Sequence, residues 1–583
     1  MYCYIINMSG DSVVYDMSSM SEGTPSVFVR RDNLTILDNQ NQNYNGNQSV
    51  LDTSQLANSN KYMNYREAYF TIPMVLTLTS AAADGVAFKP ATAASSADYA
   101  AGLKNWYGSV VHSLTVDLQG TTIVQQTPYI GLWNTFKLMT SLSVNDIKSQ
   151  GPQIGFFPDN ALSVSVQKAA SVNGINTVVG TAGTSNNNNA GSFTVVSGAQ
   201  NSFDEFNEGL LRRQQAWNFD LAGLTSTAST VAFSELISST SCNNLWKSYI
   251  YNKTDGTAAP TAGVWQCAIT AQVYLKHLHS FFERVPLLKG VFMKITMNLN
   301  QTSCTFTVAG AGGNMAVTSV NSPLGGVSPL MIASTNSGSA GLGASSYILS
   351  LSVGAQVQNS TQAALGAIVQ ASPLGRSILL NIPAYSFNPV YEQAYLSAPI
   401  KKIVYTDVYQ YQLINQISAG QTYNSLITNG IANIKSVLCL PYYQASANGG
   451  ILPIQCPLDP AGAGPTSPLC LQTQFNIQVS GQNAIYNTER YSYEQFMNQL
   501  YGTNAVNGGQ TDGCASGLVN LTDFEKEYCY YYVDCGRCLP VEESVPKSVN
   551  ILGTNQSAKG IDIFIFVEYG VEISIDVLTG ARV

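Results

Sequence analysis

The chain has 583 residues, which is too long for one ordinary hydrophobic core and predicts two to four domains, with two large ones fitting best. Asp, Glu, Lys and Arg make up 11% of the residues, against roughly 25% in typical soluble proteins, and the net charge is -8. The surface must therefore be largely neutral and polar, which suits packing against copies of the same chain. Nothing indicates the broad positive field of a genome-binding protein, so we expect no sequence-specific binding of nucleic acid.

The sequence contains no membrane signal. Its first residues, MYCYIINMSGD, lack a positive stretch before a short apolar run, and no segment reaches the roughly 18 continuous apolar residues of a membrane span. We expect a soluble product made in the cytoplasm, with no membrane span. The 11 cysteines are widely scattered and do not indicate a disulfide framework.

Residues 1–60 lack sustained periodicity and include the polar run NQNQNYNGNQS, which predicts an N-terminal arm or loop. We interpret the basic pair Arg30 and Arg31 as a solvated pair, with contact to a genome as the alternative.

The first predicted strand covers 67–79, where Pro73 indicates an edge or a bulge. A loop rich in Ala, Ser and Gly follows at 80–106, and 113–124 gives an alternating strand that turns at Gly120. A helix-like run follows, in which apolar residues recur every three or four positions, namely Ile130, Trp133, Phe136 and Met139.

The clearest stretch, Val264 to Asn300, reads as strand, short helix and strand. Apolar and polar residues alternate from Val291 to Asn300, as in a strand with one buried face, and Pro286 ends the helical turn predicted over 276–284. Later strands are predicted at 347–357, 403–413, 434–440, 475–479, 528–534 and 561–577. A helix begins at a capping box of Ser492 and Gln495 and is predicted to end at Gly502.

Several segments contain too little apolar surface to form a core, so we expect long exposed loops there. They are 167–202, 223–263, 302–345 and 503–517. A helix-like run at 207–217 lies between the first two, and its Arg212 and Arg213 are interpreted as part of a solvated face.

An internal duplication indicates two copies of one antiparallel β domain. SLTVDLQG from Ser113 matches QFNIQVSG from Gln474 at a constant offset of 361 between matched apolar positions, and an aromatic-bearing helix follows each strand. A Val-Pro pair recurs near the end of each copy, at 285–286 and 545–546.

No set of residues in the sequence matches a recognisable catalytic, phosphate-binding or metal-binding motif. The phosphate-binding loop G-x-x-x-x-G-K is absent because no Gly precedes a Lys, and H-E-x-x-H is absent as well. His277 and His279 could approach one metal, but we interpret them as polar positions of a connector. Cys535-Gly-Arg-Cys538 could be redox active or half of a zinc site with Cys514 and Cys529, yet its spacing and all-β context favour plain thiols. We therefore predict no catalytic, cofactor-binding or metal site.

Packing signatures spread over most of the chain give it a family resemblance. They are TPYIGLWNTFKLMTSLS (127–143), IGFFPDN (154–160), FNEGLLRR (206–213), FFERVPLLKGVFMKITMNLN (281–300), RSILLNIPAYSFNPVYEQAYLS (376–397) and the closing strands. In these the chain resembles the double jelly-roll major capsid proteins of the polinton-like virus and virophage group, within the adenovirus-type lineage.

The resemblance implies an all-β fold of two tandem eight-stranded antiparallel jelly rolls with long loops and a few short helices. We divide the chain into an arm at 1–60, a first jelly roll with crown loops at 61–385, and a second at 386–583. The implied function is a major capsid protein that forms pseudo-hexagonal homotrimers and an icosahedral shell around double-stranded DNA. Its implied partners are neighbouring capsomers, penton proteins and minor capsid proteins, and its location is the virion, after assembly inside the host cell.

Two other classes remain as alternatives. A jelly-roll carbohydrate-binding protein or adhesin would be expected to carry a signal peptide, and an all-β enzyme would be expected to show a catalytic constellation. A capsid protein that is not an enzyme is the leading interpretation. The long loops are expected at the outward crown of the shell and the arm at its base.

Overall fold

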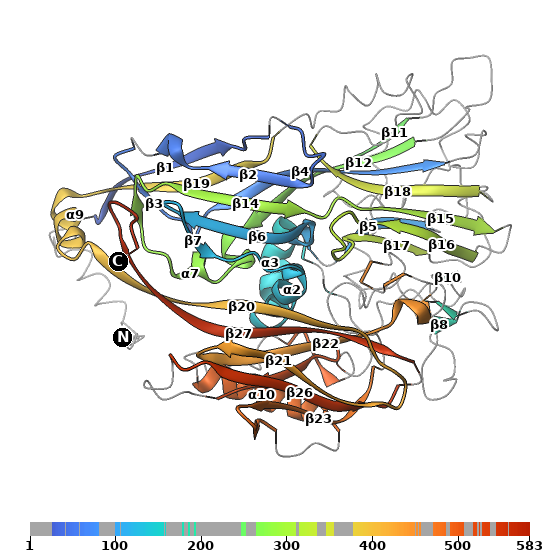
Figure 1. Ribbon diagram of the computed structural model, residues 1–583. Helices are drawn as coiled ribbons and strands as arrows, with labels where there is room; N and C mark the ends of the chain where they lie inside the picture. The colour runs from blue at the N-terminus through green and yellow to red at the C-terminus, as the bar shows by residue number, and fades with distance from the viewer. Residues whose placement is uncertain are drawn as a thin grey trace, which may run out of the picture.

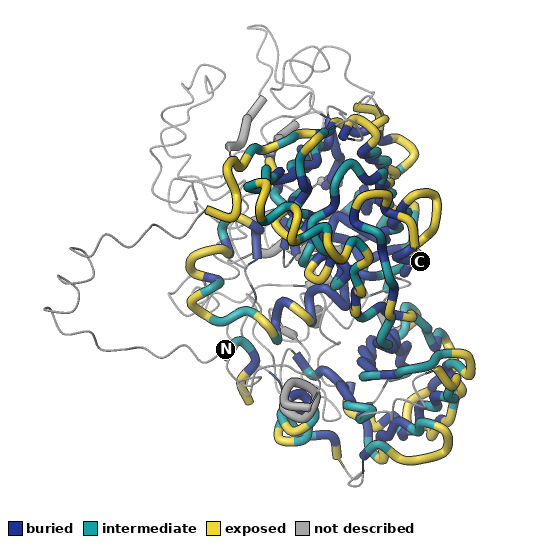
Figure 2. The backbone as a smooth tube through the Cα atoms, turned by 90° about the vertical axis from the view of Figure 1, so that its left-hand side faces the viewer, coloured by how far each residue is buried: buried dark blue, intermediate teal, exposed yellow. Residues whose placement is uncertain are grey.

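The computed structural model describes residues 26–80, 99–158, 264–334, 345–354, 377–455, 470–506 and 517–582, with short interruptions, and four short strands between 178 and 251. The chain forms two β units that lie side by side, and a helical layer stands between them (Figure 1). Buried residues fill the interior of each unit, while exposed ones follow its outer turns (Figure 2).

The second unit consists of two four-stranded antiparallel sheets. One sheet has the order β20-β27-β22-β25 and the other β21-β26-β23-β24. Numbered along the chain, these orders are 1-8-3-6 and 2-7-4-5, the winding of an eight-stranded jelly roll. The strands are β20 (Ile400–Ile417), β21 (Thr422–Ile431), β22 (Ile434–Tyr443), β23 (Gln472–Val479), β24 (Gln482–Asn483), β25 (Tyr531–Asp534), β26 (Lys547–Asn555) and β27 (Ile561–Asp576).

The first unit repeats this winding. Its sheets contain the orders β1-β19-β4-β12 and β2-β14-β6-β7, which are again 1-8-3-6 and 2-7-4-5 when its eight jelly-roll strands are numbered along the chain. The strands are β1 (Phe28–Leu37), β2 (Gln48–Asp52), β4 (Tyr69–Ser80), β6 (Val111–Leu118), β7 (Thr121–Val124), β12 (Val264–Tyr274), β14 (Met293–Leu299) and β19 (Leu379–Phe387). The fold is a double jelly roll, as the sequence predicted.

Additional strands extend the first unit. They are β3 (Tyr62–Met63), β13 (Leu288–Lys289), β10 (Ser192–Phe193), β11 (Lys247–Tyr251), β15 (Ser303–Ala309), β16 (Asn314–Asn321) and β18 (Ser345–Val353), with the pairs β5 (Tyr99–Leu103) with β17 (Leu330–Ser334) and β8 (Val178–Val179) with β9 (Ser185–Asn186). The helices are α2 (Ile130–Ser141), α3 (Val144–Ile154), α6 (Leu275–Leu278), α7 (Phe281–Arg284), α9 (Pro389–Leu396) and α10 (Tyr493–Val506), with short 3-10 turns η1 (Ser54–Leu56), η3 (Tyr107–Val110) and η9 (Ala445–Asn448).

Matching hairpins confirm the duplication. β6 turns into β7 through Gln119 and Gly120, with φ values of 48° and 80°. β23 turns into β24 through Ser480 and Gly481, with φ values of 50° and 81°. Two consecutive left-handed residues define the type I′ turn, whose twist matches that of the strands that it joins. The two units therefore have the same turn at positions that differ by 361 residues, the offset read from the sequence.

Two predictions about loops were wrong. Residues 28–37 and 48–52, within the predicted arm, form β1 and β2, because β1 pairs with β19 along its length and β2 pairs with β14. Residues 302–345, predicted as a loop, include β15, β16 and β17, and the side chains of Cys304 and Phe306 are buried. The predicted loops at 167–202 and 223–263 lie almost wholly outside the described residues, as do 507–516 and the helix-like run 207–217.

Three local predictions also needed correction. Pro73 is not at an edge, because β4 is paired on both sides. On one side, however, the strand that pairs with β4 changes from β19, whose pairing ends at Thr71, to β18, whose pairing begins at Met74. Pro73 lies in this gap, so its missing N–H breaks no hydrogen bond between strands. The helix predicted over 276–284 is two single turns, α6 and α7, separated at His279 and Ser280. α10 continues past Gly502 to Val506.

The division into domains is a proposal. Because β1 and β2 supply two of the eight jelly-roll strands, we propose that the first unit starts by Phe28 and not at residue 61. We retain the boundary near 385, since β19 ends at Phe387 and β20 begins at Ile400.

Candidate functional site: the seam between the two units

Helix α2 connects the two units by lying along strand β27 (Figure 1). Tyr129 at its N-cap and Trp133 within it make ring contacts with Phe564 and Phe566 at 5.0 and 6.3 Å between centroids, and Lys137 binds Glu568. The contacts join every fourth residue of the helix to every second residue of the strand. Four helical residues rise about 6 Å and two strand residues about 6.8 Å, so successive contacts stay aligned along the two elements. We call the contact of residues 123–141 and 275–285 with the sheet of β20, β27, β22 and β25 the seam.

Aromatic side chains fill the middle of the seam. Phe136 of α2 contacts the rings of Tyr530 and Tyr532 at 5.0 and 5.1 Å, and both tyrosines are at most 2% exposed. Such pairs contribute about 0.5–1.5 kcal/mol each beyond their area burial. This outer face of the second unit is therefore a core surface and not a solvated one.

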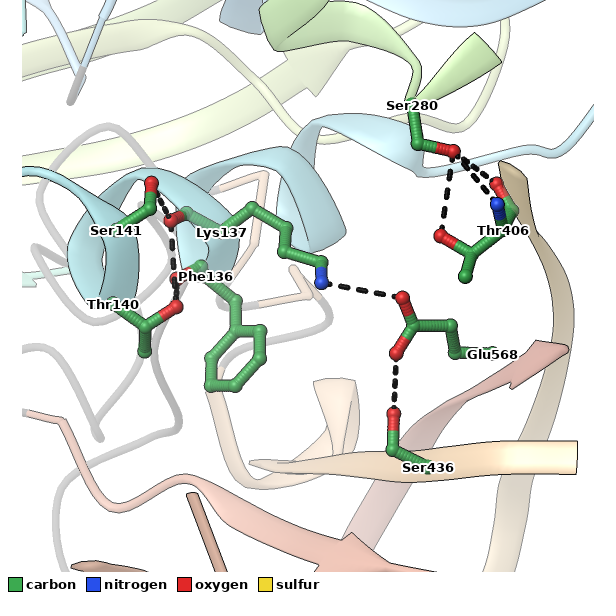
Figure 3. Close-up of polar contacts among 8 residues, drawn as sticks. All are labelled: Phe136, Lys137, Thr140, Ser141, Ser280, Thr406, Ser436 and Glu568. Carbon is green, nitrogen blue, oxygen red and sulfur yellow. Dashed lines mark hydrogen bonds and ion pairs between the residues drawn. The ribbon is translucent and has the colours of Figure 1, made fainter. Parts of the chain in front are cut away.

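A buried charge lies at one end of the row of contacts between α2 and β27 (Figure 3). Glu568 is 4% exposed, and its two carboxylate oxygens accept from Lys137 at 3.2 Å and Ser436 at 2.7 Å. Burial alone would raise the pKa of Glu568, but Lys137 and hydrogen bonds from Ser436 and Thr406 outweigh burial and hold that pKa below its usual value. The carboxylate therefore stays charged and fixes the position of α2.

The connector formed by α6 and α7 binds the edge strand β20. His279 Nε2 lies 3.2 Å from Asp407 Oδ1, and both side chains are 5% exposed. Ser280 donates to the carbonyl of Thr406 and accepts from its N–H at 3.1 Å, and Phe281 contacts the ring of Tyr405 at 5.4 Å. These contacts join the two units by specific polar bonds as well as by apolar packing.

Two bonds from the opposite direction complete the seam. Tyr405 Oη donates to the carbonyl of Ile123 at 2.8 Å, and Thr127 Oγ1 donates to the carbonyl of Val408 at 2.9 Å. The two units are thus held as one body at four consecutive residues of β20, 405–408.

A cleft of about 930 Å³ opens beside the seam. Its lining mixes both charges, with Lys276, Arg284 and Lys435 alongside Glu283 and Glu572. It shows no arrangement of an acid and a base around one position, and no group of three or more His, Cys, Asp or Glu residues suited to a metal occurs among the residues that the structure describes.

Among the described residues, those singled out in the sequence do not come together in one site. His279 bonds Asp407, whereas His277 lies against the rings of Trp106 and Tyr274, and burial with the charge of Lys276 lowers the pKa of His277 to about 4. Cys535 is half-buried after β25, while Cys538 and Cys514 lie outside the described residues. Arg30 and Arg31 form exposed ion pairs with Asp32 and Glu67, in agreement with the solvated interpretation.

Sequence reasoning missed the seam. The signal available was the pair of charges Asp562 and Glu568 in the otherwise apolar run IDIFIFVEYG, because a charge within an apolar run needs a partner if the run is buried. That run is buried on both faces from Ile561 to Val567, although a jelly-roll sheet buries only one face against its own partner sheet.

Comparison with known proteins gives structural neighbours alone. No known family description and no curated protein matches the sequence. Among solved structures, the chain is similar to a chain of the Sputnik virophage cryo-EM structure at 9% identity, covering 96% of this chain and 89% of that one, with a TM-score of 0.45. It is similar to the mavirus major capsid protein at 9% identity, 100% and 94% coverage and a TM-score of 0.40, and to the Faustovirus major capsid protein at 10%, 94% and 91%, and 0.42. The likeness is one of fold.

Within the described residues, no helix is both long and apolar enough to span a membrane.

Proposed function

We propose that the chain is a major capsid protein that forms pseudo-hexagonal trimers and, from them, an icosahedral shell around double-stranded DNA. The observation that carries this proposal is the pair of units with identical strand order, fixed side by side by a buried seam. A chain built in this way presents two similar blocks in one rigid orientation.

Three such chains would present six similar blocks around one axis. Closed cyclic symmetry is the usual solution for a soluble homo-oligomer, and a head-to-tail contact closes into a ring when its rotation permits. Six blocks approximate a hexagon, which tiles a surface, whereas a single jelly roll would need six separate chains to do so.

The surface chemistry supports a shell protein more than a catalyst. The chain is 11% charged, and its net charge of -8 offers no field for binding DNA, so the genome would be enclosed rather than gripped. We propose neighbouring capsomers, penton proteins and minor capsid proteins as its partners, and the virion as its location after assembly inside the host cell. The end of the molecule that carries α9 would face the interior, and the opposite end, which carries β15 and β16, would face outward (Figure 1).

Light scattering of the purified chain, followed by electron microscopy of expressed particles, tests this proposal. A stable trimer that assembles into closed shells is the expected result. A monomer at all concentrations that binds glycans on an array would instead indicate the carbohydrate-binding alternative.

A further inference from the structure

The outer face of the sheet β1-β19-β4-β12, which we call face 1, has exposed and partly exposed polar side chains along β1, β19 and β4 among the residues that the structure describes. A row of uncharged side chains crosses it: Thr35 on β1 donates to Asn381 on β19 at 3.0 Å, and Asn381 donates to Thr71 on β4 at 2.9 Å. Thr35 and Leu37 are exposed, and Asn381 and Thr71 are partly buried. Helix α3 reaches the β12 border, where Gln153 bonds Gln272 at 2.8 Å.

The equivalent face of the second unit is not open. Its strands β20, β27, β22 and β25 have the same order as β1, β19, β4 and β12, but there α2 covers the face, and Phe564 and Phe566 beneath it are at most 1% exposed. One of two equivalent faces is therefore sealed within the chain, while its counterpart has polar exposed residues.

The duplication also identifies a helix that could cover face 1. The matching turns fix the offset between the two units at 361 residues. At that offset, the three residues at the N-cap of α2 and within it that contact β27, namely Tyr129, Trp133 and Lys137, correspond to Arg490, Glu494 and Asn498. Arg490 lies just before α10, and the other two lie within it. All three of these positions are exposed. We call Arg490, Glu494 and Asn498 the α10 stripe. Phe496 and Leu500, on the other side of α10, are buried within their own unit, so the α10 stripe faces outward.

We propose that Arg490, Glu494 and Asn498 of one copy lie on face 1 of the next copy, so that the seam inside each chain is repeated between chains. The proposal rests on the trimer proposed above and names its contact surfaces. Each copy uses two different surfaces, α10 and face 1, so the contact runs head to tail and three copies can close a ring.

The chemistry of the two surfaces fits this role. The internal seam is never separated from its partner, so it can be aromatic and apolar, whereas a surface that is exposed until assembly must remain soluble. Face 1 offers hydroxyl and amide groups, and the α10 stripe offers a guanidinium, a carboxylate and an amide that can bond them.

The test places positive charge on each surface separately. Thr35→Arg with Asn381→Arg changes face 1, Asn498→Arg changes α10, and Asn424→Arg on exposed β21 of the opposite sheet is the matched control. We expect the first two proteins to require concentrations on the order of 100-fold higher to form trimers, because an unpaired buried charge costs several kcal/mol, and we expect the control to form trimers like the wild type. Melting temperatures equal to that of the wild type diluted until it dissociates show that the variants are folded.

Mixing the two defective variants tests the pairing of the surfaces. The intact α10 of the face 1 variant can bind the intact face 1 of the α10 variant, so heterodimers are expected, but neither trimers nor dimers of one variant alone. If each variant is monomeric and the mixture gives no heterodimer, the two surfaces do not bind each other and the proposal is wrong.

Hydrogen exchange of the wild type gives a readout that needs no substitution. Peptides covering 28–37 and 490–500 should exchange more slowly in the trimer than in the dissociated chain, while 422–431 should not change. A wild-type trimer that shows no such protection, or that persists in both variants, overturns this inference but leaves the proposed function standing. A wild type that stays monomeric and forms no particles overturns both.

Discussion

At the scale of single residues, Lys137 compensates a buried charge, and its removal should be costly. Lys137→Met leaves Glu568 without its cation, and we expect a loss of about 1–2 kcal/mol, moderated because the lysine side chain is 46% exposed and solvent already screens the pair. Thermal melting at pH 7 measures the effect.

The control for this substitution is Lys402→Met. Lys402 also pairs with a glutamate, Glu572, but the two side chains are 60% and 54% exposed, so its removal should change the melting temperature little. Equal losses for the two lysines would show that the buried position of Glu568 is unimportant.

Acid should reduce the difference between Lys137→Met and the wild type. The pKa of Glu568 in the folded wild type is lowered, so the stability that its charge contributes is present above the ordinary value of 4.5 and is lost as the pH falls through the lowered pKa. Without Lys137, burial raises that pKa and the carboxyl takes up its proton earlier. The melting temperatures of the two proteins should therefore approach each other below pH 4.5.

One buried histidine, His112, and one partly buried histidine, His277, predict a second dependence on pH. Burial lowers the pKa of His112 and of His277 to about 4, from an ordinary value of 6.5. Because the folded chain keeps both rings neutral, their contribution is complete above pH 6.5 and is lost as the pH falls toward 4. His277→Gln should flatten the fall in melting temperature between pH 6.5 and 4, and an unchanged slope would contradict this account.

At the scale of elements, the two type I′ turns should be equally sensitive to substitution. Gly120→Ala and Gly481→Ala add a methyl group that meets no atom within 4 Å, so their cost is the left-handed backbone alone, about 1–2 kcal/mol each. Gly46→Ala, equally open but without a positive φ, should cost much less. Unequal losses at the two turns, measured by thermal melting, would show that the hairpins are not energetically equivalent.

Strands with one buried face could be predicted from the sequence, and strands held by backbone pairing could not. β14 alternates buried and partly exposed residues, which matches the pattern read from Val291 to Asn300. In β1 the only fully buried residue is Ile36, so no apolar period marks the strand, and its place is fixed by pairing with β19 from 342 or more residues away.

The seam was beyond prediction for a related reason. A period of 3.6 residues identified α2 as a helix with an apolar face, but α2 is buried nearly all round because it has a unit on each side. Which strand covers the second side depends on contacts between residues more than 400 positions apart, such as Lys137 with Glu568, and the local pattern contains no information about that pairing.

At the scale of the whole molecule, the low charge of the surface makes a prediction about the oligomer. Face 1 and the α10 stripe carry few charges: Arg490 and Glu494 on the stripe, and Arg31 on face 1, which is already paired with Glu67. Coulomb attraction between chains is therefore a small part of their proposed contact. The Debye length falls from about 10 Å at 0.1 M salt to about 3 Å at 1 M, which removes attraction between exposed charges but leaves apolar burial and buried hydrogen bonds in place.

We therefore expect the trimer to persist from low to molar salt. Light scattering at increasing sodium chloride concentrations, at a protein concentration near the point of half dissociation, is the sensitive measurement. The control is the intramolecular pair Lys137–Glu568, which is partly shielded from salt by burial and should keep the units docked throughout, as an unchanged melting temperature would show. Dissociation into folded monomers at molar salt would mean that the contact between copies is mainly ionic. Because face 1 and the α10 stripe carry few charges, the copies would then have to meet elsewhere.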